Sequence, residues 1–322
     1  MDSSDPWRLL AESLLGKAEF TTVEVAAEAA VDPERARQLW RALGFPPVAD
    51  DERLFTRSDI EILRAVRQLI ELRGTDPDEL LQMTRVIGQS LARLVDAQVT
   101  AVAGRLERLH ADAAGQTAAA EVVQRVQALT PTLEQFLGYV WRRHLLAALR
   151  RLSAAPSLAD RSLTVGFADL VGFTTISQAL DAQELAAMVD RFEAIAYEHI
   201  PERGGRVVKL IGDEVMFAAD DPVAAAEIAL ALVDAHARDA ALPDVRVGLA
   251  SGPVLSWEGD LYGPTVNLAS RLVNLARPHA VLVDEALGEQ LQNNPAFALR
   301  HLRAVPLKGI GRVRVWLLRR GA

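Results

Sequence analysis

The stretch SLTVGFADLVGFTTIS, residues 162–177, decides the fold of the second half of the chain. It opens with an apolar run that is typical of a buried strand, and Gly172 then lets the backbone turn into a helix. Further on, GGRVVKLIGDEVMFAA (204–219) is predicted to form two strands around a tight turn. Because such hairpins interrupt the alternation of strands and helices, the pattern favours an α+β fold over a doubly wound parallel sheet.

The other elements of this half are predicted from the same periodicities. Apolar residues three and four apart indicate helices, and short apolar runs bounded by turn residues indicate strands. The expected helices cover 176–200, 222–239 and 266–276, and the expected strands lie at 245–255, at the start of 280–291 before a further helix, and as a final pair within 299–320.

The composition is that of a globular protein with about two domains. The chain has 322 residues, of which 50% are hydrophobic, a net charge of −8 and no cysteine. The lack of cysteine excludes a disulfide scaffold and a catalytic thiol, and it suits a reducing compartment. No apolar run approaches the roughly 18 residues of a membrane span, and the N-terminus is acidic where a signal peptide is basic. We therefore expect a cytoplasmic protein, and the negative charge disfavours nucleic acid as a partner.

The first half of the chain is predicted to be helical. Residues 1–73 contain short helices and residues 76–152 long ones, a linker follows at 153–160, and the α+β domain occupies 161–322. The order helix, turn, helix, LFTRSD (54–59), helix in the first segment resembles a MerR-type winged helix-turn-helix. That segment carries ten Lys or Arg against fourteen Asp or Glu, a balance that favours a protein contact over DNA.

Two acidic residues stand at strand ends in the second half. Asp169 ends a strand just before a predicted helix start at Phe173 and Thr174, where free N–H groups can bind phosphate. Asp213 occupies the turn of KLIGDEVMF (209–217). Carboxylates at the tips of adjacent strands can hold two Mg²⁺ or Mn²⁺ ions and leave room for substrate phosphates. The alternatives are a strand-end cap at Asp169 and a Gly-Asp turn chosen for its backbone.

A third feature is the pair Asn267 and Arg271 in VNLASRLVNLA (266–276). Four residues apart, they share one face of a helix. The amide suits a sugar oxygen and the guanidinium suits phosphate charge. The alternative is an ordinary solvated helix face.

Four motifs, taken in this order, resemble the class III adenylyl and guanylyl cyclase family. They are FADLVGFTTIS (167–177), KLIGDEVMF (209–217), RVGLASGPV (246–254) and YGPTVNLASR (262–271). The resemblance extends over nearly all of residues 163–318 and implies a ferredoxin-like βαββαβ core with additions. It also implies a head-to-tail homodimer with active sites at the interface. The link PVLSWEGDL (253–261) is shorter than the hairpin arm of many members, so the chain resembles the short-arm bacterial type.

The resemblance also implies which residues form the site. By motif position these are the metal ligands Asp169 and Asp213, the base-reading Lys209 and Asp260, the ribose-orienting Asn267, the transition-state-stabilising Arg271, and the substrate-binding Arg246, Lys308, Phe173 and Thr174.

The implied reaction converts ATP to 3′,5′-cyclic AMP and pyrophosphate with two Mg²⁺ or Mn²⁺ ions per site. Adenine offers a donor at its amine and an acceptor at N1, which Asp260 and Lys209 complement, and unpaired polar groups would penalise guanine. Because one chain carries every implied residue, a homodimer would contain two equal sites.

The first half resembles the N-terminal regulatory domain of soluble actinobacterial cyclases, some of which respond to pH. His144, beside two arginines on the last helix before the linker, is the candidate pH sensor, and a surface histidine without a role is the alternative. Two other functions stay open for the whole chain. It could be a catalytically silent cyclase-like signalling module, or a DNA-binding regulator with a nucleotide-sensing domain.

Overall fold

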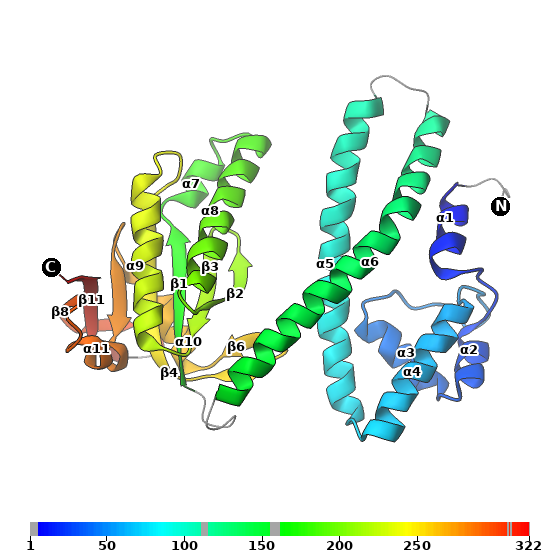
Figure 1. The fold of residues 1–322 in the computed structure, drawn as a ribbon, viewed down its shortest axis with the longest axis horizontal. Coiled ribbons are helices and arrows are strands. Elements are labelled where there is room, and N and C mark those ends of the chain that lie inside the picture. The colour runs from blue at the N-terminus through cyan, green and yellow to red at the C-terminus, as the bar shows by residue number, and fades with distance from the viewer. Residues whose placement is uncertain (1–5, 111–114, 155–161, 308, 310, 322) are drawn as a thin grey trace. The chain divides into compact units, whose positions relative to one another are not determined.

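The computed structural model describes residues 6–110, 115–154, 162–307, 309 and 311–321. It divides the chain into two compact units, Met1–Arg151 and Leu152–Ala322 (Figure 1). Within the described residues, no helix has the length and hydropathy that crossing a bilayer requires.

The first unit is built from helices. They are α1 (Pro6–Leu15), α2 (Thr22–Ala29), α3 (Pro33–Ala42), α4 (Arg57–Arg73), α5 (Pro77–His110) and α6 (Gly115–Ala154). Buried side chains of α2, α3 and α4, among them Val25, Leu39 and Leu63, form its core. In place of a two-stranded wing, the described residues of this unit contain the isolated bridge between Phe20 and Phe55.

Two helix ends of this unit bear on the predicted boundaries. The Thr56 N–H donates to the Asp59 carboxylate at 2.7 Å, so α4 begins at Arg57, directly after Thr56. Helix α6 runs without interruption through Pro131. Of the predicted linker 153–160, the first two residues belong to α6 and the rest lie outside the described residues.

The second unit is built on a seven-stranded sheet with the order β2-β3-β1-β4-β7-β11-β8. Its strands are β1 (Ser162–Leu170), β2 (Arg206–Ile211), β3 (Glu214–Ala219), β4 (Val245–Pro253), β7 (Val281–Asp284), β8 (Phe297–His301) and β11 (Val315–Arg320). Neighbouring strands are antiparallel except β4 and β7. Two short hairpins complete the strands: β5 (Leu255–Trp257) with β6 (Asp260–Tyr262), and β9 (Val305–Leu307) with β10 (Gly311–Val313).

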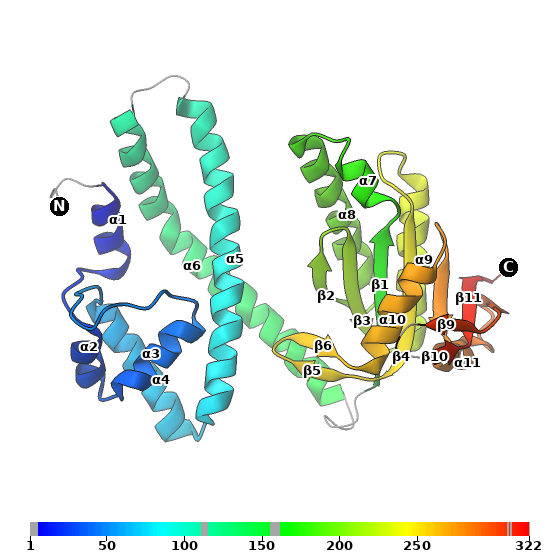
Figure 2. The ribbon, with the colours of Figure 1, turned by 180° about the vertical axis from the view of Figure 1, so that it is seen from behind.

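Helices cover both faces of this sheet. They are α7 (Phe173–Ser177), α8 (Ala182–Glu202), α9 (Pro222–Arg238), α10 (Pro264–Leu275) and α11 (Glu285–Leu291). One face, here called the three-helix face, packs against α8, α9 and α11 and buries Phe192 and Phe217. The opposite face, here called the α10 face, is covered by α10 (Figure 2). Phe167 of β1 and Ala269 of α10 belong to the core buried there.

The α+β prediction is confirmed. The succession β1–α8–β2–β3–α9–β4, with strand order β2-β3-β1-β4, is the ferredoxin-like arrangement. Two element predictions were wrong. The helix expected over 176–200 is divided, because the Asp181 side chain accepts the N–H groups of Gln183 and Glu184 at 2.8 Å and starts α8 anew. The region expected to hold two final strands contains four, β8 to β11.

Candidate active site

The alternation of side chains along the strands gathers charged residues on the α10 face. The register pairs Glu214 of β3 with Asp169 of β1, and Asp169 with Arg246 of β4. Directly paired residues point to the same face of a sheet, so these three form a row across it. Phe167 and Met216, two residues away along β1 and β3, pack under α10 and identify the face. The row therefore lies on the α10 face, where β1 ends.

Asp169 and Arg246 form an ion pair within this row. Nη2 and Nε of Arg246 lie 2.6 and 2.7 Å from the same oxygen, Oδ2 of Asp169. The side chain of Arg246 is 27% exposed and that of Asp169 is 15% exposed, so solvent screens the pair only partly. Charge-assisted hydrogen bonds of this length are strong, and Arg246 fixes the orientation of the carboxylate.

The turn between β2 and β3 brings Asp213 beside this pair. Gly212 in the turn has φ of +64°, a conformation that favours glycine. The Leu170 N–H donates to the Asp213 carbonyl at 3.1 Å, which ties the turn to the end of β1. Burial and the nearby charge of Asp169 raise the pKa of Asp213, while Arg246 acts in the opposite direction. Two carboxylates in mutual repulsion are an arrangement that a cation would stabilise.

Glu214 was not singled out from the sequence. Burial, followed by the charges of Asp169 and Asp213, raises the pKa of the Glu214 carboxyl to about 7, although Arg246 and Lys209 oppose the shift. The signal was present, because Glu214 is the one charged residue of the strand EVMFAA. An acid in an otherwise apolar strand needs a cationic partner or a role.

Lys209 of β2 and Asp260 of β6 form a second ion pair on the α10 face. The register of β2 pairs Lys209 with Met216, which fixes the face. Asp260 also accepts the N–H of Leu261 at 2.7 Å. The side chains of Lys209 and Asp260 are 39% and 21% exposed, so a ligand can reach both. The pair offers a donor and an acceptor side by side.

Asn267 and Arg271 lie on the outer side of α10. The residues of α10 that pack toward the sheet are Thr265, Ala269, Leu272 and Val273. Asn267 and Arg271 fall between them and are exposed. Within one chain, the structure thus brings together Asp169, Asp213 and Arg246, while Asn267 and Arg271 face away from their own sheet.

Three further residues, Phe173, Thr174 and Lys308, were predicted to bind substrate. Phe173 is half-buried and packs against the core of the three-helix face. Thr174 is exposed on the short helix α7. Lys308 lies outside the described residues.

The donor set fits a divalent cation that is shared with a substrate. Among the described residues, no group of three or more His, Cys, Asp or Glu side chains is arranged to hold a metal by itself. Mg²⁺ commonly binds through one or two carboxylates together with substrate phosphates and water. Asp169 and Asp213 are the carboxylates of the charged row that could take this part.

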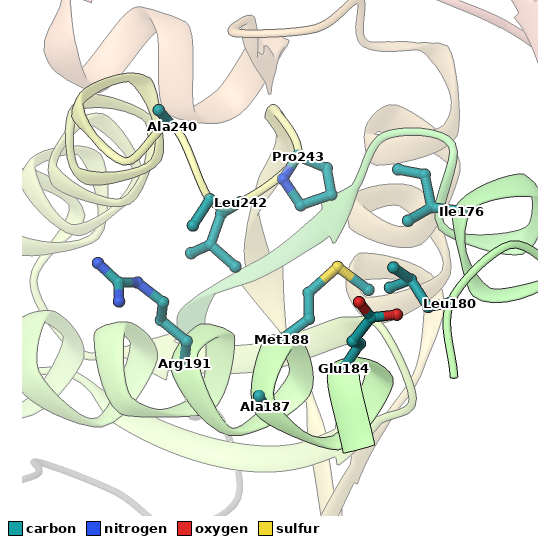
Figure 3. A pocket seen from close by; sticks show the side chains of 10 residues that line it. Ile176, Leu180, Glu184, Ala187, Met188, Arg191, Ala240, Leu242 and Pro243 are labelled. Carbon is teal, nitrogen blue, oxygen red and sulfur yellow. The ribbon is translucent and has the colours of Figure 1, made fainter. Parts of the chain in front are cut away.

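The second unit also contains a cavity of about 560 Å³ between α7, α8 and residues 240–243 (Figure 3). Its lining is mostly apolar, including Met188 and Leu242, with Arg191 and Glu184 as the charged members. None of the predicted site residues lines it. The cavity and the charged row are therefore separate features of the domain.

In the first unit, acids engage arginines of α3, the second helix of the predicted helix-turn-helix. Arg37 lies 2.8 Å from Asp50 and 3.4 Å from Glu34, and Arg41 also pairs with Glu34. These carboxylates offset the positive charge of the two arginines, and binding to nucleic acid depends on such charge. His144, the candidate pH sensor, is exposed on α6.

Both units match known protein families. Residues 157–320 match the adenylate and guanylate cyclase catalytic domain, and residues 1–151 match the adenylate cyclase regulatory domain. An adenylate cyclase of Streptomyces coelicolor is 39% identical over 98% of this chain and 90% of its own length. One of Glutamicibacter nicotianae is 35% identical, covering 95% and 80% of the two chains. A pH-sensitive adenylate cyclase of Mycobacterium tuberculosis is 33% identical, covering 93% and 78%.

Proposed function

The chain belongs to the adenylate and guanylate cyclase family, and we propose that it converts ATP to 3′,5′-cyclic AMP and pyrophosphate at a site shared by two copies. The observation that carries the proposal is the meeting of Asp169, Asp213 and Arg246 at the end of β1. Relatives named adenylate cyclase support the product.

Lys209 and Asp260 would select the base. Their ion pair places an ammonium donor beside a carboxylate acceptor. Adenine presents the complementary acceptor at N1 and donor at its amine. Guanine presents the reverse, and each polar group left unpaired would cost about 1–3 kcal/mol. We therefore expect ATP to be used in preference to GTP.

Asp169 and Asp213 would hold the two metal ions. When bound, Mg²⁺ or Mn²⁺ would favour loss of the ribose 3′-proton and stabilise the charge on the leaving pyrophosphate. Arg246 holds Oδ2 of Asp169 in place and presents a positive charge at the edge where the triphosphate would lie.

Asn267 and Arg271 would act on the reacting atoms. Asn267 would hold the ribose so that its 3′-oxygen is in line with the α-phosphorus. As the bond between the 3′-oxygen and the α-phosphorus forms and the bond to pyrophosphate breaks, Arg271 would stabilise the charge on the α-phosphate. Phosphoryl transfer depends mainly on such positioning and charge stabilisation.

A second copy of the chain would complete each site. Asn267 and Arg271 are directed away from their own sheet by the packing of α10, which supports their action on a nucleotide held at the carboxylates of a partner. A two-fold interface repeats every contact, so a homodimer would hold two equal sites.

The first unit would regulate this activity. The relative named pH-sensitive supports a response to pH, and His144 is exposed on α6. Replacement of His144 by Gln in the full chain should flatten the pH dependence of activity. An unchanged profile would remove His144 from the proposal.

The decisive experiment measures cyclic AMP formed by the purified chain from MgATP and MnATP, with GTP in parallel. Asp213→Ala and Arg271→Ala should each be inactive, and a mixture of the two should recover part of the activity because one intact site can form. If no mixture recovers activity, the shared site is wrong. If GTP is preferred, the assignment of Lys209 and Asp260 is wrong.

A further inference from the structure

Glu214 is the carboxylate of the charged row that the proposed chemistry leaves without a role. It stands directly opposite Asp169 in the β1–β3 ladder and next to Asp213 in the chain. Side chains paired in this way have Cβ atoms about 4.5–5.5 Å apart and point to the same side. Glu214 is therefore held by the sheet itself, rather than by a loop, against both metal-binding candidates.

This placement is unfavourable for the fold when no cation is bound. Three partly buried carboxylates, Asp169, Asp213 and Glu214, meet at one edge of the sheet, since Glu214 is paired with Asp169 across the ladder and follows Asp213 in the chain. Like charges held so close repel one another. The two cations of the α10 face described above each pair with another acid, Arg246 with Asp169 and Lys209 with Asp260. A carboxylate kept in such surroundings lowers the stability of the empty domain.

The same placement favours binding of a divalent cation. A carboxylate that does not touch the metal still attracts it through a partly buried, weakly screened medium. Groups around the direct ligands often change metal affinity by about 10–100-fold. Among the described residues, Glu214, Asp169 and Asp213 are not arranged as a three-ligand cluster. Glu214 would therefore act on the metal without contacting it.

We propose that Glu214 is a positioning residue for the metals: its carboxylate increases the affinity of Asp169 and Asp213 for divalent cations without being a ligand. The inference rests on the proposed function, since it concerns the same site. It predicts opposite effects of one substitution on metal affinity and on the stability of the empty protein.

The test measures Mn²⁺ binding to the full chain at pH 8 by electron paramagnetic resonance, with MnCl₂ as the probe and no nucleotide present. Glu214→Gln removes the charge and keeps the shape, while Glu214→Asp keeps the charge. Glu198→Gln is the matched control, because Glu198 is an exposed acid on α8, on the other side of the sheet. The melting temperature of each variant is recorded with and without MnCl₂.

Glu214→Gln should weaken Mn²⁺ binding by about tenfold or more and raise the melting temperature of the metal-free protein. Glu214→Asp should retain most of the affinity, and Glu198→Gln should match the unaltered chain in both measurements. A Gln variant that binds Mn²⁺ as tightly as the unaltered chain overturns the inference. A Gln variant that melts at a lower temperature without metal also overturns it, since Glu214 would then be a structural residue.

Asp213→Asn separates this inference from the proposed function. If Mn²⁺ binding depends on Asp213 but not on Glu214, the positioning role fails and the metal site stands. If Mn²⁺ binding is indifferent to Asp213 as well, the metal site of the proposed function fails.

Discussion

The two faces of the central sheet are made by the same strands and differ in almost every physical respect. The three-helix face carries the larger apolar core, with Phe192 of α8 and Phe217 of β3 both almost fully buried. The α10 face has a smaller core and, beyond it, the row from Glu214 to Arg246. Neighbouring residues of one strand therefore lie on different faces: Glu214 belongs to the charged row, and Val215 belongs to the apolar core of the three-helix face. The three-helix face holds the larger apolar core, and the α10 face holds the charged row.

The largest expected effect is the loss of activity in Arg271→Ala on the outer side of α10. An arginine that stabilises the charge of phosphoryl transfer contributes about 10³–10⁵-fold to the rate. Because Arg271 is exposed, the melting temperature should hardly change. Rates of cyclic AMP formation and thermal unfolding check both statements. Arg277 is an exposed arginine just after α10, and Arg277→Ala should keep its activity. A similar loss of activity in Arg277→Ala would mean that the effect is not specific to Arg271.

Next in size is the loss of stability in Phe192→Ala, which attacks the other face. Truncation of a buried phenylalanine costs about 3–5 kcal/mol in the free energy of unfolding. Denaturant unfolding measures this value. The folded fraction should still convert ATP, because Phe192 lies across the sheet from the charged row. Tyr197→Ala, at an exposed position of the same helix, should cost far less.

A smaller effect is expected for Asp284→Asn, an acid that is buried beside the α10 face but outside the site. Burial raises the pKa of Asp284 to about 6, although the N–H groups of Leu287 and Ser251 act in the opposite direction. A raised carboxyl pKa means that the folded state binds the proton more tightly, so stability present below pH 4 is lost as pH rises through about 6. At pH 8, the free energy of unfolding of Asp284→Asn, measured with denaturant, should exceed that of the unaltered chain by up to about 3 kcal/mol. This difference should vanish near pH 4.

Activity is the control for Asp284→Asn. This variant should convert ATP as the unaltered chain does, since Asp284 is not part of the charged row. Loss of activity with a folded protein would show that acids on the α10 face cannot be divided into structural and functional ones.

The smallest effect concerns His236 of α9, on the three-helix face. His236 is 2% exposed, its Nδ1 lies 2.8 Å from the Leu232 carbonyl, and burial lowers its pKa. The unfolded chain then binds the proton more readily, so stability falls as pH drops below about 6.5. In His236→Leu this slope should be reduced, by at most about 1.4 kcal/mol per pH unit. Unfolding curves from pH 7.5 to 5.5 measure it, and an unchanged slope would assign acid sensitivity elsewhere.

The sequence allowed prediction of features that are encoded locally. An apolar run followed by a glycine turn gives the strand-end position of Asp169, and the Gly-Asp turn gives that of Asp213. The start of α8 was encoded locally too, in the capping residues after Leu180, but the apolar periodicity on both sides of the break concealed it. Where the helix begins is decided by the hydrogen bonds of its capping residue, and the apolar periodicity contains no information about these bonds.

The contacts within the site could not be predicted in this way. Arg246 and Asp169 are 77 residues apart, and their ion pair depends on the register of β1 with β4. A shift of one residue would place Arg246 on the opposite face. The position of Glu214 opposite Asp169 depends on register for the same reason, which is why its charge was visible in the sequence and its neighbours were not.

If Lys209 and Asp260 read the base as proposed, their ion pair would make recognition of the nucleotide an exchange rather than an addition. An arriving base must separate two partners that already satisfy each other, and it repays this separation only if it satisfies both. A base that matches one of them leaves the pair free to close again and expel it. Selectivity for the base would then come from the tendency of Lys209 and Asp260 to pair with each other again.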